Sequence, residues 1–428
     1  MRDHSVKQTR VWVLHPDFKK NHTRRSAVEA IEEAVSLAMA LPHMELCGKT
    51  VVRVDRPHPG ALFGSGKIAE LKDVLHDAEV DLVLVDGPLT PVQQRNLEKH
   101  WDVKILDRTG LILEIFSDRA ATREGVLQVE MAALSYQRTR LVRAWTHLER
   151  QRGGLGFVGG PGETQIEADR RAIDEHLVRL RRQLDRVVKT RTLHRASRAK
   201  VPFPIVALVG YTNAGKSTLF NRLTGADVVA KDMLFATLDP TMRSIELGGQ
   251  MKVILSDTVG FISDLPTELV AAFRATLEEV LAADVILHVR DITHAESEQQ
   301  SRDVLEIIHS LGVREDVPII EIWNKIDLAT PDEKEPLLIK AARQQSIAIS
   351  AHTGEGLDLL TGEVLDTLAP AVVEEHRSVP YAASAQRAWL FERGLVLSEE
   401  HDETGFSLHI RWSERDRASF MAQFSTEA

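Results

Sequence analysis

The sequence predicts an α/β protein built from several parts. The largest part is a mostly parallel sheet with helices on both faces, preceded by a small α/β domain and an antiparallel helical hairpin, and followed by a small α+β appendage. Three observations predict this order. Strand-like runs alternate with amphipathic stretches, two heptad-patterned segments flank a glycine-rich stretch, and 428 residues are too many for one domain. We place the domains at residues 1–110, 111–200, 203–370 and 371–428.

The first domain alternates strand-like and helix-like stretches, as a βαβ arrangement requires. Its strand-like stretches are residues 11–14, 50–54, 80–86 and 103–106, and its helix-like stretches are residues 27–41, 68–76 and 91–99. This order predicts a small α/β domain with a mostly parallel sheet. The appendage contains the short runs 387–391, 396–397 and 406–410, a turn at Gly394 and a closing helix-like stretch at 414–424, from which we predict a small α+β unit.

The hairpin is predicted from heptad spacing in two segments. Apolar residues recur at steps of four and three in the second segment, at Ile173, Leu177, Leu180, Leu184 and Val187. The first segment keeps the same period at Leu127, Met131, Leu134, Leu141, Trp145 and Leu148. Arg138 interrupts that period. Six of the ten residues from 153 to 162 are Gly, so we expect neither helix nor strand at this tip.

Charge is segregated along the chain. The net charge is −10, yet residues 138–200 contain 16 Lys and Arg against 7 Asp and Glu, which makes this segment +9 and the remainder −19. The outer face of the second hairpin helix is predicted to carry Arg170, Arg171, Arg179, Arg181, Arg182, Arg186, Lys189, Arg191, Arg195 and Arg198. A one-sided basic helix suits RNA phosphates. The alternative is a solvated coiled coil with a flexible linker.

The third domain begins with a nucleotide-binding motif. The apolar run 205–209 leads to a G-x-x-x-x-G-K-S loop, made of Gly210, Tyr211, Thr212, Asn213, Ala214, Gly215, Lys216 and Ser217. Glycines at both ends let backbone N–H groups face phosphates at the N-terminus of the next helix. Lys216 is expected to reach the β- and γ-phosphates, and Ser217 to ligate Mg²⁺. The chain is therefore predicted to bind a nucleoside triphosphate.

A second motif indicates which base is bound. The strand-like run 317–323 leads to an N-K-x-D sequence that resembles the guanine-specificity motif of GTPases, namely Asn324, Lys325, Ile326 and Asp327. The Asp327 carboxylate can accept hydrogen bonds from guanine N1–H and the 2-amino group, whereas adenine offers neither donor there. Lys325 would lie along the ring, and Asn324 would tie the segments together. ATP should therefore bind less well than GTP.

A short motif near the base completes this end of the predicted site. The strand-like run 346–349 leads to Ser350, Ala351 and His352. These residues resemble the S-A motif of GTPases, which implies that their backbone contacts the guanine oxygen.

Two further segments are predicted to sense the γ-phosphate. The strand-like run 251–256 leads to a D-x-x-G sequence, namely Asp257, Thr258, Val259 and Gly260. In GTPases this Asp holds Mg²⁺ through water and this Gly N–H contacts the γ-phosphate. The first switch loop is expected at Phe235, Ala236, Thr237, Leu238 and Asp239. Thr237 is the predicted second hydroxyl on Mg²⁺, with Thr241 as its competitor, and Lys216, Thr237 and Gly260 are the predicted participants in hydrolysis.

Two residues bear on the rate of hydrolysis. Phe261 follows Gly260 where Ras-like GTPases carry the Gln that orients the attacking water, so we expect slow hydrolysis without a partner. Asn213 stands where some related GTPases help to hold a monovalent cation. A K⁺ ion beside Mg²⁺ is therefore a further hypothesis.

The order of these features resembles the HflX family of ribosome-associated GTPases. The residues that carry the resemblance are 107–109, 127–130, the glycine-rich run 153–165 with 166–171, and the five nucleotide motifs. The resemblance implies a P-loop GTPase that binds the large ribosomal subunit and its rRNA near the peptidyl-transferase region, and that splits or rescues stalled ribosomes under stress. It also implies an ATP-using activity of the N-terminal domain, for which residues 1–110 show no site.

Other functions stay open beside this one. The chain could be an ATP-driven RNA-remodelling enzyme that acts through its N-terminal domain, or a GTPase of an enzyme complex whose coiled coil is a dimerisation arm. We expect a cytoplasmic protein, because no run of about 18 apolar residues and no signal core is present. We also expect the free protein to be monomeric. The single cysteine, Cys47, excludes an intramolecular disulfide.

Overall fold

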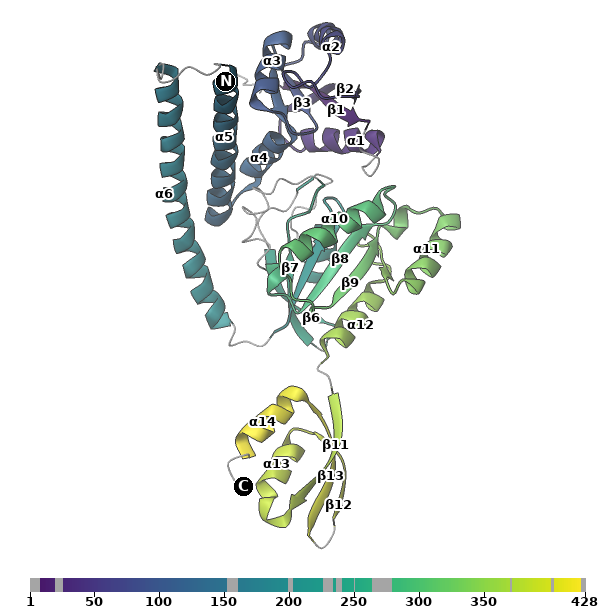
Figure 1. The fold of residues 1–428 in the computed structure, drawn as a ribbon. Helices are drawn as coiled ribbons and strands as arrows, with labels where there is room; N and C mark the ends of the chain where they lie inside the picture. The colour runs from purple at the N-terminus through teal and green to yellow at the C-terminus, as the bar shows by residue number, and fades with distance from the viewer. Residues whose placement is uncertain are drawn as a thin grey trace, which may run out of the picture. The chain divides into compact units, whose positions relative to one another are not determined.

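The computed structural model describes residues 8–19, 26–151, 161–198, 203–225, 234–235, 241–249, 251–263, 279–369, 372–401 and 404–424 (Figure 1). Side chains of residues 141–151, 161–166, 190–198, 372, 414, 415, 418 and 422 fall outside this description. The chain forms two compact units, Met1–Val364 and Leu365–Ala428. Among the described helices, none combines the length and the apolar character needed to cross a bilayer.

The N-terminal domain is a four-stranded sheet in which all neighbouring strands run parallel, in the order β2-β1-β3-β4. Its strands are β1 (Thr9–Phe18), β2 (Met44–Val54), β3 (Leu82–Val85) and β4 (Lys104–Asp107). Its helices are α1 (Ala27–Ala38), α2 (Ser65–Asp77), α3 (Pro91–Trp101) and α4 (Arg108–Arg119). The predicted parallel α/β domain is confirmed.

Helix α4 packs into the core of this domain. Its residues Leu111, Ile112, Ile115 and Phe116 are all buried in the main hydrophobic cluster. Asp107 caps the helix, because its carboxylate accepts a hydrogen bond from the Gly110 backbone N–H at 2.9 Å. The boundary that we placed at residue 110 therefore falls inside α4.

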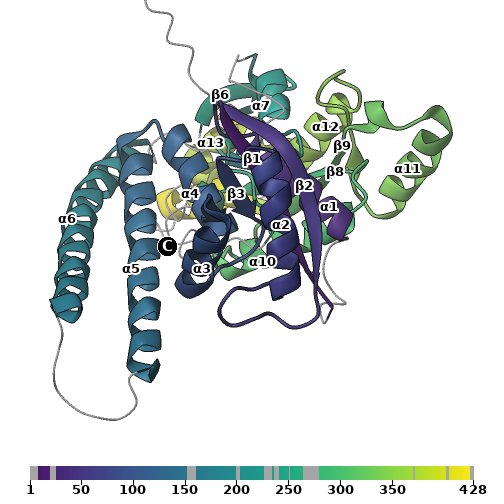
Figure 2. The same ribbon diagram turned by 90° about the horizontal axis from the view of Figure 1, so that it is seen from above.

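The hairpin consists of α5 (Arg123–Gln151) and α6 (Pro161–Arg198), which lie side by side in Figures 1 and 2. The predicted seam on α6 is covered: Leu180 is 3% exposed, and the other four seam residues are half-buried. Arg138, which interrupts the heptad on α5, forms an ion pair with Asp174 of α6, with 2.7 Å between Nε and Oδ1. A polar pair thus replaces an apolar one at that level of the seam.

The predicted glycine-rich tip, residues 153–162, coincides only partly with the loop between the two helices. Residues 153–160 lie outside the described part of the chain, and α6 already begins at Pro161. Proline is favoured in the first turn of a helix, because its missing N–H has no partner there in any case. The expectation of no helix is therefore wrong for residues 161 and 162.

The third domain is a six-stranded sheet in the order β10-β9-β8-β5-β7-β6, parallel except for the antiparallel edge pair β6–β7. Its strands are β5 (Ile205–Gly210), β6 (Thr241–Leu247), β7 (Met251–Asp257), β8 (Val285–Asp291), β9 (Ile319–Asn324) and β10 (Ile347–Ala348). Its longer helices within the described residues are α7 (Lys216–Thr224), α10 (Ser297–Ser310), α11 (Pro331–Arg343) and α12 (Leu357–Leu368).

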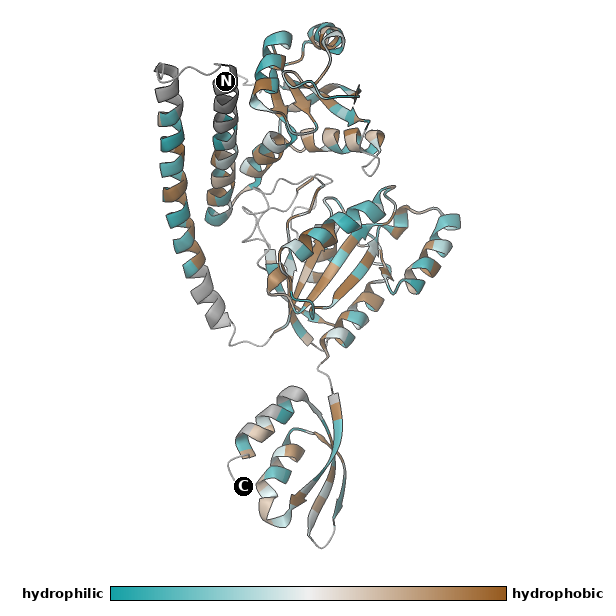
Figure 3. Cartoon of the chain, in the orientation of Figure 1, coloured by the Kyte–Doolittle hydropathy of each residue, from teal (hydrophilic) through white to brown (hydrophobic). Residues whose placement is uncertain are grey.

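The order of strands in this sheet places helices on both of its faces. The connection from β5 to β7 moves toward one edge of the sheet and that from β8 to β9 toward the other, so right-handed crossovers put α7 and α10 on opposite faces. Figure 3 shows apolar strands between helices whose outer sides are hydrophilic. The predicted doubly covered, mostly parallel sheet is confirmed.

The C-terminal unit is an antiparallel sheet in the order β11-β13-β12 with two helices. Its elements are β11 (Val372–Pro380), α13 (Ser384–Glu392), β12 (Val396–His401), β13 (Gly405–Ser413) and α14 (Glu414–Phe424). Trp389, Trp412 and Phe420 form its aromatic core, with ring centroids 5.4 Å apart from Phe420 to each Trp. The predicted α+β appendage is confirmed.

Candidate nucleotide-binding site

The phosphate loop lies between the end of β5 and the start of α7, as predicted. Gly210 ends the strand, and a Cβ there would lie 2.1 Å from the Val289 carbonyl oxygen. Gly215 has a φ of +93°, and a Cβ there would lie 2.2 Å from Nδ2 of Asn324. Both positions therefore admit only glycine, and the two glycines permit the tight turn that a phosphate cradle needs.

Lys216 is buried at the centre of this loop. Its Nζ donates hydrogen bonds to the carbonyl oxygens of Gly210 and Tyr211, at 3.1 and 2.8 Å. Burial lowers the pKa of Lys216 to about 8, and the nearby Asp257 carboxylate opposes that shift. An anion at the loop would favour the charged form, so the lysine is placed to bind phosphate as a cation.

Ser217 and Asp257 provide the oxygen ligands that Mg²⁺ prefers. The Ser217 hydroxyl donates to Oδ2 of Asp257 at 2.7 Å, which brings the phosphate loop and the D-x-x-G segment together. Thr241, the competitor of Thr237, lies directly opposite Asp257 in the β6–β7 register. No group of three or more His, Cys, Asp and Glu residues in the described ranges is arranged to hold a metal.

The first switch loop is described only in part. Ala236, Thr237, Leu238 and Asp239 lie outside the described residues. Phe235 is described, and its ring packs against Phe116 of α4 with 4.6 Å between ring centroids. Phe235 is 3% exposed, so its side chain belongs to the packing between the first and third domains.

The D-x-x-G segment lies directly against the phosphate loop. The Thr212 N–H donates to the Phe261 carbonyl at 2.7 Å, and the Phe261 N–H donates to the Gly210 carbonyl at 3.1 Å. A Cβ on Gly260 would lie 3.0 Å from Nζ of Lys216. Thr258 and Val259 are buried, and the Thr258 hydroxyl donates to the Leu208 carbonyl at 2.6 Å. The Phe261 ring is 2% exposed, so it has no polar group or open surface with which to orient a water molecule.

One side chain, Asn324, joins the phosphate end to the base end. Its Nδ2 donates to the Ala214 carbonyl at 2.8 Å, and its Oδ1 accepts from the Ala351 backbone N–H at 2.9 Å. Three predicted motifs thus meet at one amide. This is the tying role that we predicted for Asn324.

The remaining residues at the base end are close to that amide. Lys325 has a left-handed φ of +70°, and its Nζ lies 2.8 Å from Oδ2 of Asp291. Asp327 is exposed, as a reader of an incoming base must be, and Ile326 is buried beneath it. Ser350 is buried, and the His352 carbonyl accepts from Nη2 of Arg222 at 3.1 Å.

Asp291 was not among the predicted site residues. It ends β8 at the same sheet edge that carries the phosphate loop and the N-K-x-D segment, and it pairs with Lys325. An Asp two residues after the mostly apolar run 285–289 was a usable signal, since the carboxyl ends of parallel strands meet at one edge.

Family comparisons agree with this arrangement over most of the chain. Four family models match, described as GTP-binding GTPase N-terminal (28–117), GTP-binding GTPase Middle Region (119–198), 50S ribosome-binding GTPase (205–325) and HflX C-terminal domain (337–425). The GTPase HflX of Magnetococcus marinus is 48% identical over 84% of this chain and 82% of its own. The chain belongs to the HflX family of GTPases.

A second curated relative and a solved structure are also similar to this chain. The GTPase HflX of Escherichia coli K12 is 42% identical, over 83% of each chain. A GTP-binding protein from Sulfolobus solfataricus, solved in complex with GDP, aligns with 84% of this chain and 98% of its own at 23% identity and a TM-score of 0.44. In this HflX-family chain, the middle-region match spans the hairpin, and the N-terminal match ends within α4.

Proposed function

We propose that this GTPase binds the large ribosomal subunit through its basic hairpin and splits or rescues stalled ribosomes. The protein stays on the ribosome while GTP is bound, and GTP hydrolysis releases it. The observation that carries the proposal is the exposed face of α6. Its described basic residues all face solvent while the seam is covered; they are Arg170, Arg171, Arg179, Arg181, Arg182, Arg186 and Lys189. Such a surface suits rRNA phosphates.

The nucleotide site supports a switch that acts on this contact. Lys216 would neutralise the β- and γ-phosphates, and Ser217 with Asp257 would hold Mg²⁺, which draws charge from the phosphate oxygens. Water attacks the γ-phosphorus, the bond to the β–γ bridging oxygen breaks, and GDP and phosphate leave. Because Phe261 cannot orient that water, we propose that ribosome contact supplies or arranges the group that does.

Ribosome binding is expected to depend on the hairpin charges. Replacing Arg179, Arg182 and Arg186 with Ala should weaken co-sedimentation with ribosomes in the presence of a non-hydrolysable GTP analogue. The logarithm of affinity should also fall less steeply with the logarithm of salt concentration, by about one unit of slope for each phosphate that the variant no longer neutralises. A matched control replaces three exposed cations of the N-terminal domain, Arg53, Lys72 and Lys99, and should leave the salt slope unchanged.

Three nucleotide states and one deletion complete this test. Wild-type protein is sedimented with GTP, GDP and the analogue, and retention in none of these states would refute the proposal. Deleting residues 153–162 should leave GTP binding intact and impair ribosome splitting.

Dimerisation of the free protein through α5 and α6, without ribosome retention, would favour a dimerisation arm instead. Loss of guanine preference in Asp327→Asn, with no effect on RNA remodelling, would favour the ATP-driven alternative that acts through the N-terminal domain.

We also propose that Asn213 helps to hold a K⁺ ion at the phosphates. Asn213 is exposed in the loop and has a φ of +59°, a conformation that Asn and Gly tolerate. GTP turnover should be several-fold faster in KCl than in NaCl of equal concentration, and Asn213→Gly should remove that difference, because it keeps the backbone conformation and deletes the amide. Equal turnover of the wild type in the two salts would refute a K⁺ site.

A further inference from the structure

A buried polar cluster joins the D-x-x-G segment to the N-terminal domain. Ser263 lies three residues after Gly260, and both its backbone N–H and its backbone carbonyl form hydrogen bonds within this cluster. Its N–H donates to the Tyr211 hydroxyl at 2.9 Å, and its carbonyl accepts from Nη2 of Arg108 at 2.9 Å. Tyr211 belongs to the phosphate loop, whereas Arg108 is the first residue of α4.

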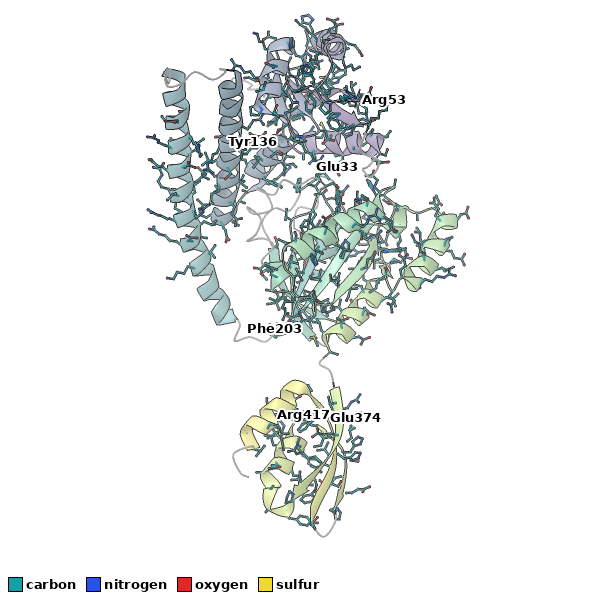
Figure 4. The ribbon with its side chains drawn as sticks, in the orientation of Figure 1. Glu33, Arg53, Tyr136, Phe203, Glu374 and Arg417 are labelled. Atoms are coloured by element: carbon teal, nitrogen blue, oxygen red, sulfur yellow. The ribbon has the colours of Figure 1, made fainter. Side chains whose placement is uncertain are left out.

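Glu33 of α1 closes this cluster. One of its carboxylate oxygens accepts from the Tyr211 hydroxyl at 2.5 Å, and the other accepts from Nη2 of Arg108 at 2.7 Å. Nη1 of Arg108 donates to Asp86 at 2.6 Å. The side chains of Arg108, Glu33 and Asp86 are each at most 8% exposed, so solvent cannot replace a missing partner. Figure 4 labels Glu33 among the side chains of α1.

The cluster makes the position of the D-x-x-G segment depend on how the N-terminal domain is docked. Gly260 is expected to donate its N–H to the γ-phosphate, which GTP has and GDP lacks. Only two residues, Phe261 and Ile262, separate Gly260 from the clamped Ser263, and both are buried. Holding Ser263 therefore pre-orders the segment for GTP and does little for GDP.

We infer that Arg108 is a positioning residue, which acts with Glu33 and Tyr211 to hold the D-x-x-G segment for the γ-phosphate and so couples GTP, more than GDP, to docking of the N-terminal domain. Coupling of this kind is reciprocal: if docking strengthens GTP binding, GTP strengthens docking by the same factor. This inference needs GTP binding alone and does not depend on ribosome contact.

The residue beside Arg108 extends the same connection to the hairpin. Asp107 accepts from the Tyr136 hydroxyl of α5 at 2.5 Å and from Nη1 of Arg140 at 3.2 Å. Tyr136 is labelled on α5 in Figure 4. Two consecutive residues therefore contact the two neighbours of the N-terminal domain, the hairpin through Asp107 and the GTPase domain through Arg108. If α4 moves relative to the GTPase domain, the contacts of Asp107 with Tyr136 and Arg140 of α5 must move too, because Asp107 and Arg108 are joined by one peptide bond.

The test compares nucleotide affinities in full-length variants. Dissociation constants for fluorescent GDP and a fluorescent non-hydrolysable GTP analogue are measured for the wild type and Arg108→Ala. We expect the GTP analogue to bind about ten-fold more weakly and GDP to change by less than about two-fold, which is within the usual range of coupling between sites. Arg108→Lys should lie between the two, because an ammonium cannot bind two carboxylates and a carbonyl in the same fork.

A matched control comes from the other end of the same helix. Arg119 is in the last turn of α4 and donates to the Ala40 carbonyl at 2.9 Å, entirely within the N-terminal domain. Arg119→Ala should leave the ratio of GTP to GDP affinity at the wild-type value. Tyr211→Phe and Glu33→Gln remove one polar group each and should shift the ratio in the same direction as Arg108→Ala, which keeps the test decisive if Arg108→Ala does not fold.

Two results would overturn the inference. The first is an unchanged affinity ratio in folded Arg108→Ala or Tyr211→Phe protein, including a parallel loss of both affinities, which would mean that the cluster has only a structural role. The second is amide hydrogen exchange in α1 and α4 that is equally fast with GDP and with the GTP analogue in the wild type. Slower exchange with the analogue is the expected outcome.

Discussion

Replacing Asp327 with Asn should abolish the preference for guanine and weaken GTP binding by about 10² to 10⁴-fold. The Asp327 carboxylate is exposed at the base end of the site and can accept both guanine donors. Hydrogen bonds to a charged group contribute about 1.5 to 3 kcal/mol each, and two of them account for the expected range. Titration with fluorescent GDP and GTP measures the change.

Xanthosine triphosphate provides the rescue for this variant. Xanthine carries a carbonyl where guanine carries the 2-amino group, and the Asn amide can donate to that carbonyl. The variant should therefore prefer xanthosine triphosphate over GTP. Asp316→Asn is the matched control, since Asp316 is exposed in the turn before β9 and pairs only loosely with Arg314, at 3.6 Å. Wild-type GTP affinity in the Asp327 variant would exclude Asp327 as the reader of the base.

Gly260→Ala should slow single-turnover GTP hydrolysis by about a hundred-fold, because displacing reacting groups by even an ångström has effects of that size. The added methyl would lie 2.8 Å from Cγ2 and 2.9 Å from Cα of Thr212. The Thr212 backbone cannot yield without moving the phosphate loop, so the D-x-x-G segment must withdraw. Withdrawal would also break the hydrogen bond between Thr212 and Phe261.

Gly362→Ala is the control for this change. Gly362 lies within α12, and an added methyl there meets no heavy atom within 4 Å. Alanine is favoured over glycine in a helix by about 0.5 to 1 kcal/mol, so this variant should be slightly more stable and should hydrolyse GTP at the wild-type rate. If Gly260→Ala hydrolysed GTP as fast as Gly362→Ala, the close contact between the segment and the phosphate loop would have no part in the reaction.

The nucleotide motifs could be predicted from the sequence because each is a short run at the end of an apolar strand. Gly210, Asp257 and Asn324 all end a strand, and parallel strands bring their carboxyl ends to one edge. The role of Asn324 could be predicted for the same reason. The heptad seam of α6 was predictable because a two-helix contact repeats along the chain.

Contacts between distant parts of the chain could not be predicted in this way. Glu33 and Tyr211 are 178 positions apart, and nothing in their local sequences pairs them. In the sequence, Arg138 only interrupts the heptad pattern, and its ion pair with Asp174 of the other helix becomes apparent only in the structure. Strand β6 was not predicted from the sequence. It lies between the two candidate switch segments, and it forms a strand by pairing with β7 at the edge of the sheet. A lone edge strand has no local signal as strong as a loop motif.

The Asn324 amide has a consequence for the kind of ligand that the site can retain. A guanine nucleotide is a bivalent ligand, with the base at one end and the phosphates at the other. Because Asn324 hydrogen-bonds to both Ala214 and Ala351, it holds the two half-sites at one separation. Binding of either end therefore presents the other at a high effective concentration, as a rigid linker of the right length does. Guanosine and pyrophosphate, offered separately, would each meet an intact half-site and lack this advantage.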